Sequence, residues 1–277
     1  MKPLRAIAVY KPVPKCIGIL REVANTARTR DISLEIYTVD DLANPARGGY
    51  TRDKCVNVVF SIGGDGTFLR AAKLSLLCNS TLVFPYPCGR RNAFYELINT
   101  PPSDLVDKLL EGDYFIDLYP SLTVCTSNKC ELFLNEVAIV NSNLGKAAKY
   151  RVQIKSPLIN SAFTIEGDGL LISTSPGSSG YNLSARGPLT SPLLDSIIIT
   201  PLNPLQVGLP PIVLPRVSVI EVTIANSSTI YIDGNFLGVF EKDSVIQVTY
   251  SSRYVKVIRF SPSRDLVRAV LASRAFT

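Results

Sequence analysis

Short apolar runs alternate with segments of helical spacing along the N-terminal part of the chain. Residues 6–10, 34–39, 56–62 and 82–84 form apolar runs that predict strands, whereas residues 17–27, 68–77 and 103–110 predict helices. The run at 56–62 is almost uninterrupted, as expected for a strand buried on both faces of a parallel sheet. Ser103 is the predicted N-cap of the third helix.

The pattern changes from about residue 113, where strand-like stretches follow one another without a convincing amphipathic helix. The expected strands cover residues 118–125, 131–140, 150–155, 163–173, 217–225, 229–232 and 244–250. A final strand at 255–260 and a helix at 263–273 are expected to rejoin the first domain. The sequence therefore predicts a Rossmann-like α/β domain over residues 1–112 and 253–277, and a mostly antiparallel β-sandwich domain over residues 113–252.

Composition narrows the class of protein. With 46% apolar and 19% charged residues among 277, the chain has the make-up of a globular protein rather than a disordered one. No window approaches the roughly 18 uncharged apolar residues of a membrane span, and the N-terminus lacks a signal-peptide pattern. We expect a soluble, cytoplasmic protein with no membrane partner. Histidine is absent, which excludes Ser-His-Asp triads, Cys-His pairs and histidine proton shuttles.

The six cysteines contain no C-x-x-C pair, so a thiolate zinc site is not expected. Cys125 and Cys130 could face each other across a hairpin, but reduced, buried thiols are the preferred interpretation. The net charge of +6 is scattered along the chain. It suits an anionic ligand such as a nucleotide, and without a Lys/Arg-rich run it does not indicate a nucleic-acid partner.

The segment Gly63-Gly64-Asp65-Gly66-Thr67 joins a predicted buried strand to a predicted helix. Glycines let backbone N–H groups and a helix N-terminus come close to a phosphate. Asp65 would repel a phosphate unless a cation or a substrate hydroxyl lay between them, which indicates a Mg²⁺ ligand or a proton acceptor. Thr67 can cap the helix. The alternative is an ordinary tight turn, in which Asp and Gly serve only as turn formers.

A second polar segment runs from Glu166 to Ala185 and joins a strand to a loop of small hydroxyl residues. Such a loop can bind a polar ligand, and Tyr181 could stack on a base or bind through its hydroxyl. Asn135 and Glu136 lie inside an apolar strand, where unpartnered polar groups are costly, so they are expected to meet a ligand or each other. The alternative for the Gly/Ser/Pro cluster is a surface connection.

In this order, the segments resemble the NAD kinase family. The family's G-G-D-G-T loop corresponds to residues 63–67, its N-E pair to Asn135-Glu136, its G-D-G to residues 167–169, and its T-P-T-G-S-T-A-Y-like loop to residues 174–181. G-G-D-G alone is shared with diacylglycerol, sphingosine and 6-phosphofructo-kinases, so the later motifs narrow the resemblance. It spans roughly residues 55–240, and the family's architecture is also an α/β domain followed by a β-sandwich.

The resemblance implies transfer of a phosphoryl group from ATP or polyphosphate to the 2′-hydroxyl of the adenosine ribose of NAD, giving NADP. The α/β domain would hold the phosphate donor and the β-sandwich would hold NAD. Asp65 would be catalytic and would help to hold Mg²⁺ or another divalent metal, while Gly63, Gly64, Gly66 and Thr67 would bind the donor phosphates. The implied NAD-binding residues are Asp65, Gly66, Asn135, Glu136, Asp168, Thr174, Ser178, Ser179, Gly180 and Tyr181. Family members are commonly dimers or tetramers, so a homo-oligomer is expected.

Residues 85–94 depart from the N-x-G-x-x-G-F pattern usual in the family. They are closer to the P-x-G-x-x-N loop of diacylglycerol and sphingosine kinases. This stretch carries Arg90 and Arg91, which could clamp phosphates or be solvated charges on a turn. Two alternatives therefore stay open: a related kinase acting on a lipid or another hydroxyl acceptor, and a nucleotide-binding regulator without turnover.

Overall fold

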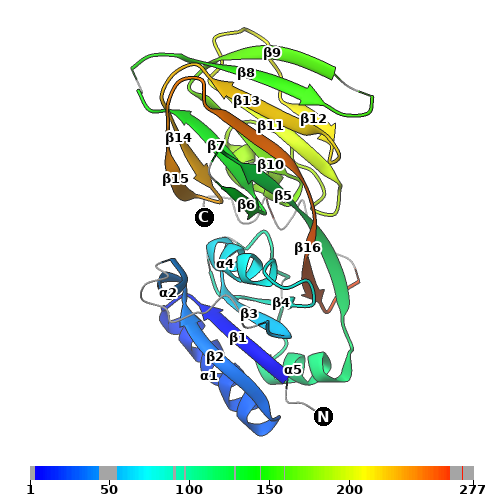
Figure 1. The fold of residues 1–277 in the computed structure, drawn as a ribbon. Helices are drawn as coiled ribbons and strands as arrows, with labels where there is room; N and C mark the ends of the chain where they lie inside the picture. The colour runs from blue at the N-terminus through cyan, green and yellow to red at the C-terminus, as the bar shows by residue number, and fades with distance from the viewer. Residues whose placement is uncertain are drawn as a thin grey trace. The chain divides into compact units, whose positions relative to one another are not determined.

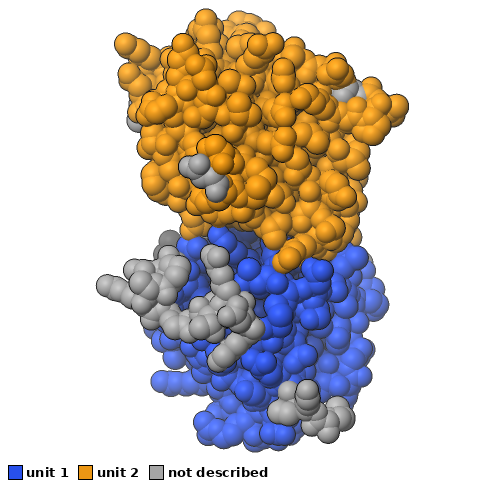
Figure 2. Space-filling view, viewed as in Figure 1, with its two compact units in different colours: residues 1–118, 255–277 blue, residues 119–254 orange. Residues whose placement is uncertain are grey.

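The structure, a computed structural model, describes residues 4–43, 55–89, 92–96, 98–127, 129–143, 145–158, 160–262 and 270. The chain forms two compact units (Figure 2). Unit 1 comprises Met1–Leu118 and Val255–Thr277, and unit 2 comprises Tyr119–Tyr254. Both junctions fall inside strands, β5 (Phe115–Cys125) and β16 (Val245–Arg259). A hydrophobicity pattern does not mark such a junction, because the strand itself continues through it.

Unit 1 is built on a parallel sheet, as its apolar runs predict (Figure 1). The strand order is β2-β1-β3-β4, and the carboxyl end of β16 pairs in parallel with β4. The bounds are β1 Leu4–Tyr10, β2 Ile32–Thr38, β3 Val58–Gly63 and β4 Leu82–Pro87. Every residue of β3 is buried, because this strand lies between neighbours and helices cover both of its faces.

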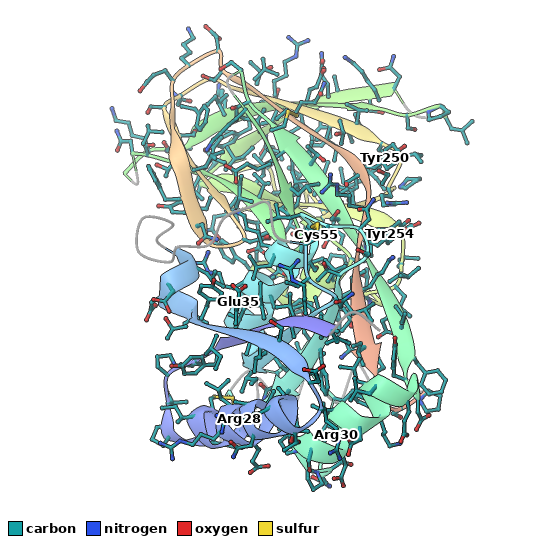
Figure 3. All side chains as sticks on the ribbon, turned by 60° about the horizontal axis from the view of Figure 1, so that its bottom comes forward. Arg28, Arg30, Glu35, Cys55, Tyr250 and Tyr254 are labelled. Atoms are coloured by element: carbon teal, nitrogen blue, oxygen red, sulfur yellow. A yellow bond between two sulfur atoms is a disulfide. The ribbon has the colours of Figure 1, made fainter. Side chains whose placement is uncertain are left out.

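Helices cover this sheet on both sides. They are α1 (Pro14–Thr29), α2 (Val39–Ala43), α4 (Asp65–Ser75) and α5 (Pro102–Glu111). α1 and α5 pack together over one face, where Leu20 and Leu105 join the core. α4 packs against β3 and β4 and buries Phe68. Arg30, just after α1, donates two hydrogen bonds of 2.7 and 3.0 Å to the carboxylate of Asp107, which ties α1 to α5 (Figure 3).

The start of α5 differs from the prediction. The sequence predicts Ser103 as the N-cap, but the helix begins at Pro102 after Pro101. A proline in the first turn lacks only an N–H that the helix would leave unpaired, and its φ is already helical. The Ser103 hydroxyl donates instead to the carboxylate of Asp104 at 3.0 Å.

Unit 2 is a sandwich of two largely antiparallel sheets. One sheet has the order β12-β11-β10-β7-β14-β15, and the other joins β16, β13, β8 and β9, with β5 and β6 beside β16. The bounds are β6 Cys130–Phe133, β7 Glu136–Asn141, β8 Ala148–Lys155, β9 Asn160–Gly167, β10 Gly169–Thr174, β11 Ser196–Leu202, β12 Ile212–Pro215, β13 Val219–Ile224, β14 Ser228–Ile232 and β15 Asn235–Phe240. Ile172, Ile199 and Ile220 belong to the core between the sheets. Two short helices, η1 (Pro176–Ser179) and α6 (Tyr181–Ser184), follow β10. The predicted fold class is confirmed.

Two stretches predicted as single strands are each divided. Residues 131–140 form β6 and β7, and residues 163–173 form β9 and β10 with Asp168 between them. After Asp168, Gly169 has φ +156°, and a Cβ there would lie 2.2 Å from the carbonyl oxygen of Ile139. The chain passes at this point from one sheet to the other, because β9 pairs with β8 whereas β10 pairs with β7 and β11. An apolar run does not show which sheet each of its halves joins.

The prediction of reduced thiols is wrong in this structure. Disulfides join Cys16 to Cys88, Cys55 to Cys78 and Cys125 to Cys130, with Cα–Cα distances of 5.5, 5.7 and 4.1 Å. The third lies across the β5–β6 hairpin, which is the alternative that the sequence left open. The first two join residues 72 and 23 positions apart, and only the folded chain brings such residues within bonding distance. Disulfides are typical of secreted proteins and of intracellular proteins of hyperthermophiles.

The strand expected at residues 255–260 is the carboxyl end of β16, which pairs with β4 of unit 1 through Lys256 and Leu82. The helix expected at residues 263–273 lies outside the described residues, apart from Val270. Within the part of the chain that the structure describes, no helix has both the length and the apolar character needed to cross a bilayer.

Candidate functional site

The loop from Gly63 to Thr67 connects the end of β3 to the start of α4. Gly64 is the N-cap of the helix and Asp65 is its first residue. Thr67 does not cap the helix, contrary to the prediction. It is buried in the first turn, and a Cβ on Gly63 would lie 2.1 Å from Thr67 Oγ1. Glycine is therefore required at position 63 by the packing of Thr67.

The N-terminus of α4 is suited to an anion. The first N–H groups of an α-helix have no carbonyl partner within the helix, and the helix dipole places partial positive charge there. A Cβ on Gly66 would meet no atom within 4 Å, so this side of the loop is open. Asp65 places one carboxylate beside the same N-terminus. The loop therefore combines a surface suited to an anion such as a phosphate with a single negative group.

The segment after β4 packs over this loop, and we name its described residues, 88–89 and 92–96, the brace. Cys88 and Gly89 both donate their backbone N–H groups to the carbonyl oxygen of Gly63, each at 2.9 Å. A Cβ on Gly89 would lie 2.6 Å from the Cα of Gly64. The brace therefore touches the backbone of the helix N-cap at this point.

Two further residues of the brace hold the loop. Tyr95 donates its hydroxyl to the carbonyl oxygen of Gly64 at 2.9 Å and is also hydrogen-bonded to Ser61 at 2.8 Å. Phe94 donates its backbone N–H to Asp65 Oδ1 at 3.2 Å. The side chain of Asp65 is therefore oriented by the brace as well as by the helix.

Arg90 and Arg91, predicted to clamp donor phosphates, lie outside the residues that the structure describes. Their described neighbours are joined by a hydrogen bond of 2.9 Å from Asn92 Nδ2 to the carbonyl oxygen of Gly89. A role of the two arginines in donor binding stays a prediction.

The chemistry of the loop fits a magnesium ion that arrives with a nucleotide. Asp65 is the only carboxylate of the loop, and the described residues hold no group of three His, Cys, Asp or Glu side chains suited to a metal. Mg²⁺ commonly keeps several waters and is bound by one or two carboxylates together with substrate phosphates. Asp65 is therefore the residue that would hold the metal from the protein side.

In unit 2, Asn135 and Glu136 lie where β6 ends and β7 begins. The carboxylate of Asp233 accepts the backbone N–H groups of Leu134, Asn135 and Glu136 at 3.1, 2.7 and 3.3 Å. Asp233 lies in the turn between β14 and β15 with φ +47°. One carboxylate thus supplies the acceptor for three N–H groups at the break between two strands.

Glu136 is buried, with 7% of its surface exposed. The backbone N–H of Tyr181 donates to its carboxyl group, and its Oε2 has no hydrogen-bond partner among the described residues. Burial, and secondarily the negative charge of Asp233, raises the pKa of Glu136 to about 8. A neutral carboxyl group offers a ligand both a donor and an acceptor. Oδ1 of Asn135 is likewise buried with no partner in the described part of the chain.

The loop of small hydroxyl residues folds back onto Asn135. Thr174 donates its hydroxyl to the carbonyl oxygen of the residue before Asn135 and accepts the N–H of Gly177 at 3.0 Å. A Cβ on Gly177 would lie 2.1 Å from the carbonyl oxygen of Asn135. Ser178 donates to the carbonyl oxygen of Thr190 at 3.2 Å and accepts its N–H at 3.0 Å. The hydroxyls of Thr174 and Ser178 therefore hold the loop in shape.

Gly180 and Tyr181 complete the surroundings of Glu136. A Cβ on Gly180 would lie 3.1 Å from Glu136 Oε2. Tyr181 begins α6 and is 45% exposed, so its ring is accessible to a planar ligand. Ser179, just before them, donates its hydroxyl to a backbone carbonyl of the same turn at 3.5 Å. The structure therefore brings Asn135, Glu136, Gly180 and Tyr181 together in one place.

Asp168 lies elsewhere in unit 2. It is exposed in the turn between β9 and β10, where the side chain of Asn203 donates to its carboxylate at 2.8 Å. Its carbonyl oxygen accepts the N–H of Asn141 at 2.9 Å, whereas Glu136 pairs with Ser173 near the other end of β10. At ~3.3 Å per residue, the stretch of β7 from Glu136 to Asn141 is about 17 Å long. Within this unit, Asp168 is not brought to the Asn-Glu pair.

Sequence reasoning missed Asp233 and Asn182. Asn182 is fully buried, donates to the carbonyl oxygen of Ser178 at 3.1 Å, and accepts the hydroxyl of Thr200 at 2.6 Å. Asp233 did carry a local signal, because an Asp-Gly pair between two strand-like runs predicts a hairpin turn. Its binding to N–H groups almost a hundred positions earlier has no such signal.

The chain is similar to known proteins in both sequence and fold. The family model described as the ATP-NAD kinase C-terminal domain matches residues 134–260. The NAD kinase of Thermococcus sibiricus is 34% identical over 212 residues, which cover 74% of this chain and 74% of that protein. The NAD kinase of Aeropyrum pernix is 28% identical over 263 residues, which cover 91% of this chain and 92% of that protein. The crystal structure of an NAD kinase from Archaeoglobus fulgidus in complex with ATP has the same fold, with a TM-score of 0.74 and 24% identity over 97% of this chain and 99% of that chain. This chain belongs to the NAD kinase family.

Proposed function

We propose that this enzyme transfers the γ-phosphoryl group of ATP to the 2′-hydroxyl of the adenosine ribose of NAD, which gives NADP and ADP. The observation that carries the proposal is the position of Asp65 at the open N-terminus of α4, in a chain of the NAD kinase family. Because the chain belongs to the NAD kinase family, we do not propose that it is a related lipid kinase. Phosphorylation of another acceptor is instead one outcome of the test below.

The donor is bound by the loop of unit 1. Gly63, Gly64 and Gly66 bring the backbone and the N-terminus of α4 to the phosphates, whose negative charge the helix dipole favours. Thr67 contributes indirectly, because it packs against Gly63 and so supports the loop. When bound, Mg²⁺ neutralises charge on the phosphate oxygens. ATP is the proposed donor, and polyphosphate is the second donor to be tried.

Asp65 positions the attacking hydroxyl and accepts its proton as the oxygen–phosphorus bond forms and the bond to ADP breaks. A carboxylate is a weak base compared with an imidazole. Phosphoryl transfer nevertheless proceeds through a loose transition state, in which positioning and neutralisation of charge dominate. A chain without histidine is therefore equipped for this reaction.

NAD is bound by the cluster in unit 2. The neutral carboxyl group of Glu136 and the amide of Asn135 have unpartnered oxygens, within the described residues, that suit the hydroxyl and amino groups of adenosine. The accessible ring of Tyr181 suits stacking on the adenine base. Thr174, Ser178, Ser179 and Gly180 shape the surrounding loop. Asp168 lies too far from Glu136 within the unit to contact the same nucleoside.

The protein is proposed to form a homo-oligomer, a dimer or a tetramer. The sandwich ends in edge strands β12 and β15, which expose Val213, Phe236 and Val239 at 47%, 64% and 53%. Exposed apolar edge strands readily pair with another chain. Light scattering coupled to size-exclusion chromatography measures the mass in solution, and a monomer contradicts this part of the proposal.

An end-point assay for NADP formed from NAD, ATP and Mg²⁺ tests the reaction, with Asp65→Asn as the matched variant. Asparagine keeps the size of the side chain and removes its charge and basicity, so we expect a loss of at least about 100-fold in rate. A near-normal rate in Asp65→Asn overturns the role of Asp65. If the wild type forms no NADP from ATP or polyphosphate, the proposal fails, and the protein is either a kinase of another hydroxyl compound or a nucleotide-binding regulator without turnover.

A further inference from the structure

The Cys16–Cys88 disulfide lies next to the phosphate-binding loop. Cys16 is fully buried in the first turn of α1, and Cys88 is 8% exposed. Cys88 directly precedes Gly89, the residue whose backbone meets the N-cap of α4. The disulfide therefore fixes the chain one residue away from this contact.

We propose that the Cys16–Cys88 disulfide is a positioning device for the phosphate-binding loop. It holds the start of the brace, so that Gly89 stays against Gly64, the N-cap of the helix whose N-terminus is proposed to bind the donor phosphates. The inference rests on the proposed function of the loop as the donor site. The two cysteines contact neither substrate nor metal in this proposal, so they are positioning residues and not catalytic ones.

The brace has a second anchor at its other end. Glu96 accepts the backbone N–H groups of Phe260 and Ser261, each at 3.0 Å. The ring of Phe94 stacks on Phe68 of α4, with 4.5 Å between the ring centroids. Opening the disulfide leaves this anchor in place and releases only the end that touches the N-cap. The expected consequence is a local displacement of the loop rather than unfolding of unit 1.

The Cys55–Cys78 disulfide is a matched control in the same unit. Cys55 (Figure 3) precedes β3 and Cys78 follows α4, so this bond closes the strand–loop–helix segment at the end away from the loop. At ~1.5 Å per residue, the 11 residues of α4 span about 16 Å, and Cys78 follows the end of the helix that is opposite the N-cap. Its removal loosens the same strand and helix without acting on the brace directly.

The experiment compares Cys16→Ala/Cys88→Ala with Cys55→Ala/Cys78→Ala, each as the full chain at a temperature where circular dichroism shows it folded. A displaced loop moves the helix N-terminus and the backbone N–H groups that bind the donor phosphates, so it weakens ATP binding. We therefore expect the KM for ATP, and the Kd of ATP by calorimetry, to rise about tenfold in the first variant and less than about twofold in the second. If the disulfide only stabilises the fold, its removal lowers the amount of active enzyme. The apparent kcat then falls while the KM stays unchanged.

Two further variants keep the test decisive. Gly89→Ala retains every disulfide and pushes a Cβ to 2.6 Å from Gly64, so it should raise the KM for ATP in the same way. If the alanine pair does not fold, Cys16→Val/Cys88→Ala refills part of the lost volume and takes its place. Unchanged ATP constants in the Cys16/Cys88 variant, or equal changes in the two disulfide variants, overturn the proposal. A wild type that forms no NADP overturns the proposed function instead, and calorimetry with ATP still reads the effect of the disulfide.

Discussion

The buried carboxyl group of Glu136 should make a contribution to stability that falls as pH rises. The pKa of Glu136 is about 8 in the folded chain, against an ordinary value of 4.5, chiefly because burial disfavours its charged form. Between these two values the unfolded chain has lost the proton and the folded chain still holds it. Unfolding then releases a proton, so a rise in pH favours the unfolded state.

The magnitude follows from the two pKa values. The interval between 4.5 and about 8 corresponds, at ~1.4 kcal/mol per pH unit, to about 5 kcal/mol of unfolding free energy. This contribution is fully present below about pH 4.5 and is lost once the pH exceeds about 8. Glu136→Gln has nearly the same shape and cannot ionise, so it lacks the whole of this pH dependence.

The assay is denaturant unfolding of wild type and Glu136→Gln, followed by far-UV circular dichroism because the chain has no tryptophan. Carboxylates that do not interact with Glu136 titrate alike in both proteins and cancel in the difference between them. We expect that difference to change by about 5 kcal/mol in favour of the variant between about pH 4.5 and about pH 9. A difference constant to within ~1 kcal/mol would refute the reasoning, because it would mean that Glu136 titrates alike in the folded and unfolded chain.

Three other outcomes are expected. Asp233→Asn should lower the unfolding free energy by about 2 kcal/mol, since hydrogen bonds to charged groups contribute ~1.5–3 kcal/mol; an unchanged denaturation midpoint would contradict its role at the β6–β7 break. Tyr181→Ala should weaken NAD binding about tenfold while Tyr181→Phe leaves it near normal, since stacking of a ring on a base contributes ~1–3 kcal/mol; equal losses in calorimetry would assign the effect to the hydroxyl. Removing the Cys16–Cys88, Cys55–Cys78 or Cys125–Cys130 disulfide should lower the unfolding free energy by about 4, 3 or 2 kcal/mol, respectively. The order follows the closed loops, which shorten from 72 to 23 to 5 residues. Another order in scanning calorimetry would rule out chain entropy as the main source of the stabilisation.

The elements that the sequence predicted well are those whose cause is local. The apolar run before Gly63 forms β3, buried on both faces, because burial on both sides of a parallel sheet demands such a run. The glycines and Asp65 lie at the turn between this strand and a helix, as their order in the sequence predicts. The sequence predicts Ser103 as the N-cap of α5, which is two residues after the true N-cap, Pro101. The prediction misses because Pro101 and Pro102 occupy the start of the helix instead.

Other features depended on residues far apart along the chain. The N–H groups around Asn135 are held by Asp233, almost a hundred positions later. The pKa of Glu136 depends on burial and, secondarily, on the same carboxylate, and no local sequence pattern reveals either cause. Gly169 marks the point where the chain changes sheets, and that change separates Asp168 from the Asn-Glu pair although a shared motif set suggested one site.

The sequence by itself determined the order of the two domains, the family and the position of the loop proposed to bind phosphate, because each is encoded by residues within a few positions of one another. The tertiary structure alone decided that Cys16 pairs with Cys88 and Cys55 with Cys78, which carboxylate accepts the N–H of Glu136, and which predicted site residues meet. Contacts of that kind close loops of tens of residues, and the entropy lost in closing them is offset only by the assembled core. Their partners are therefore a property of the whole fold and not of any segment of the chain.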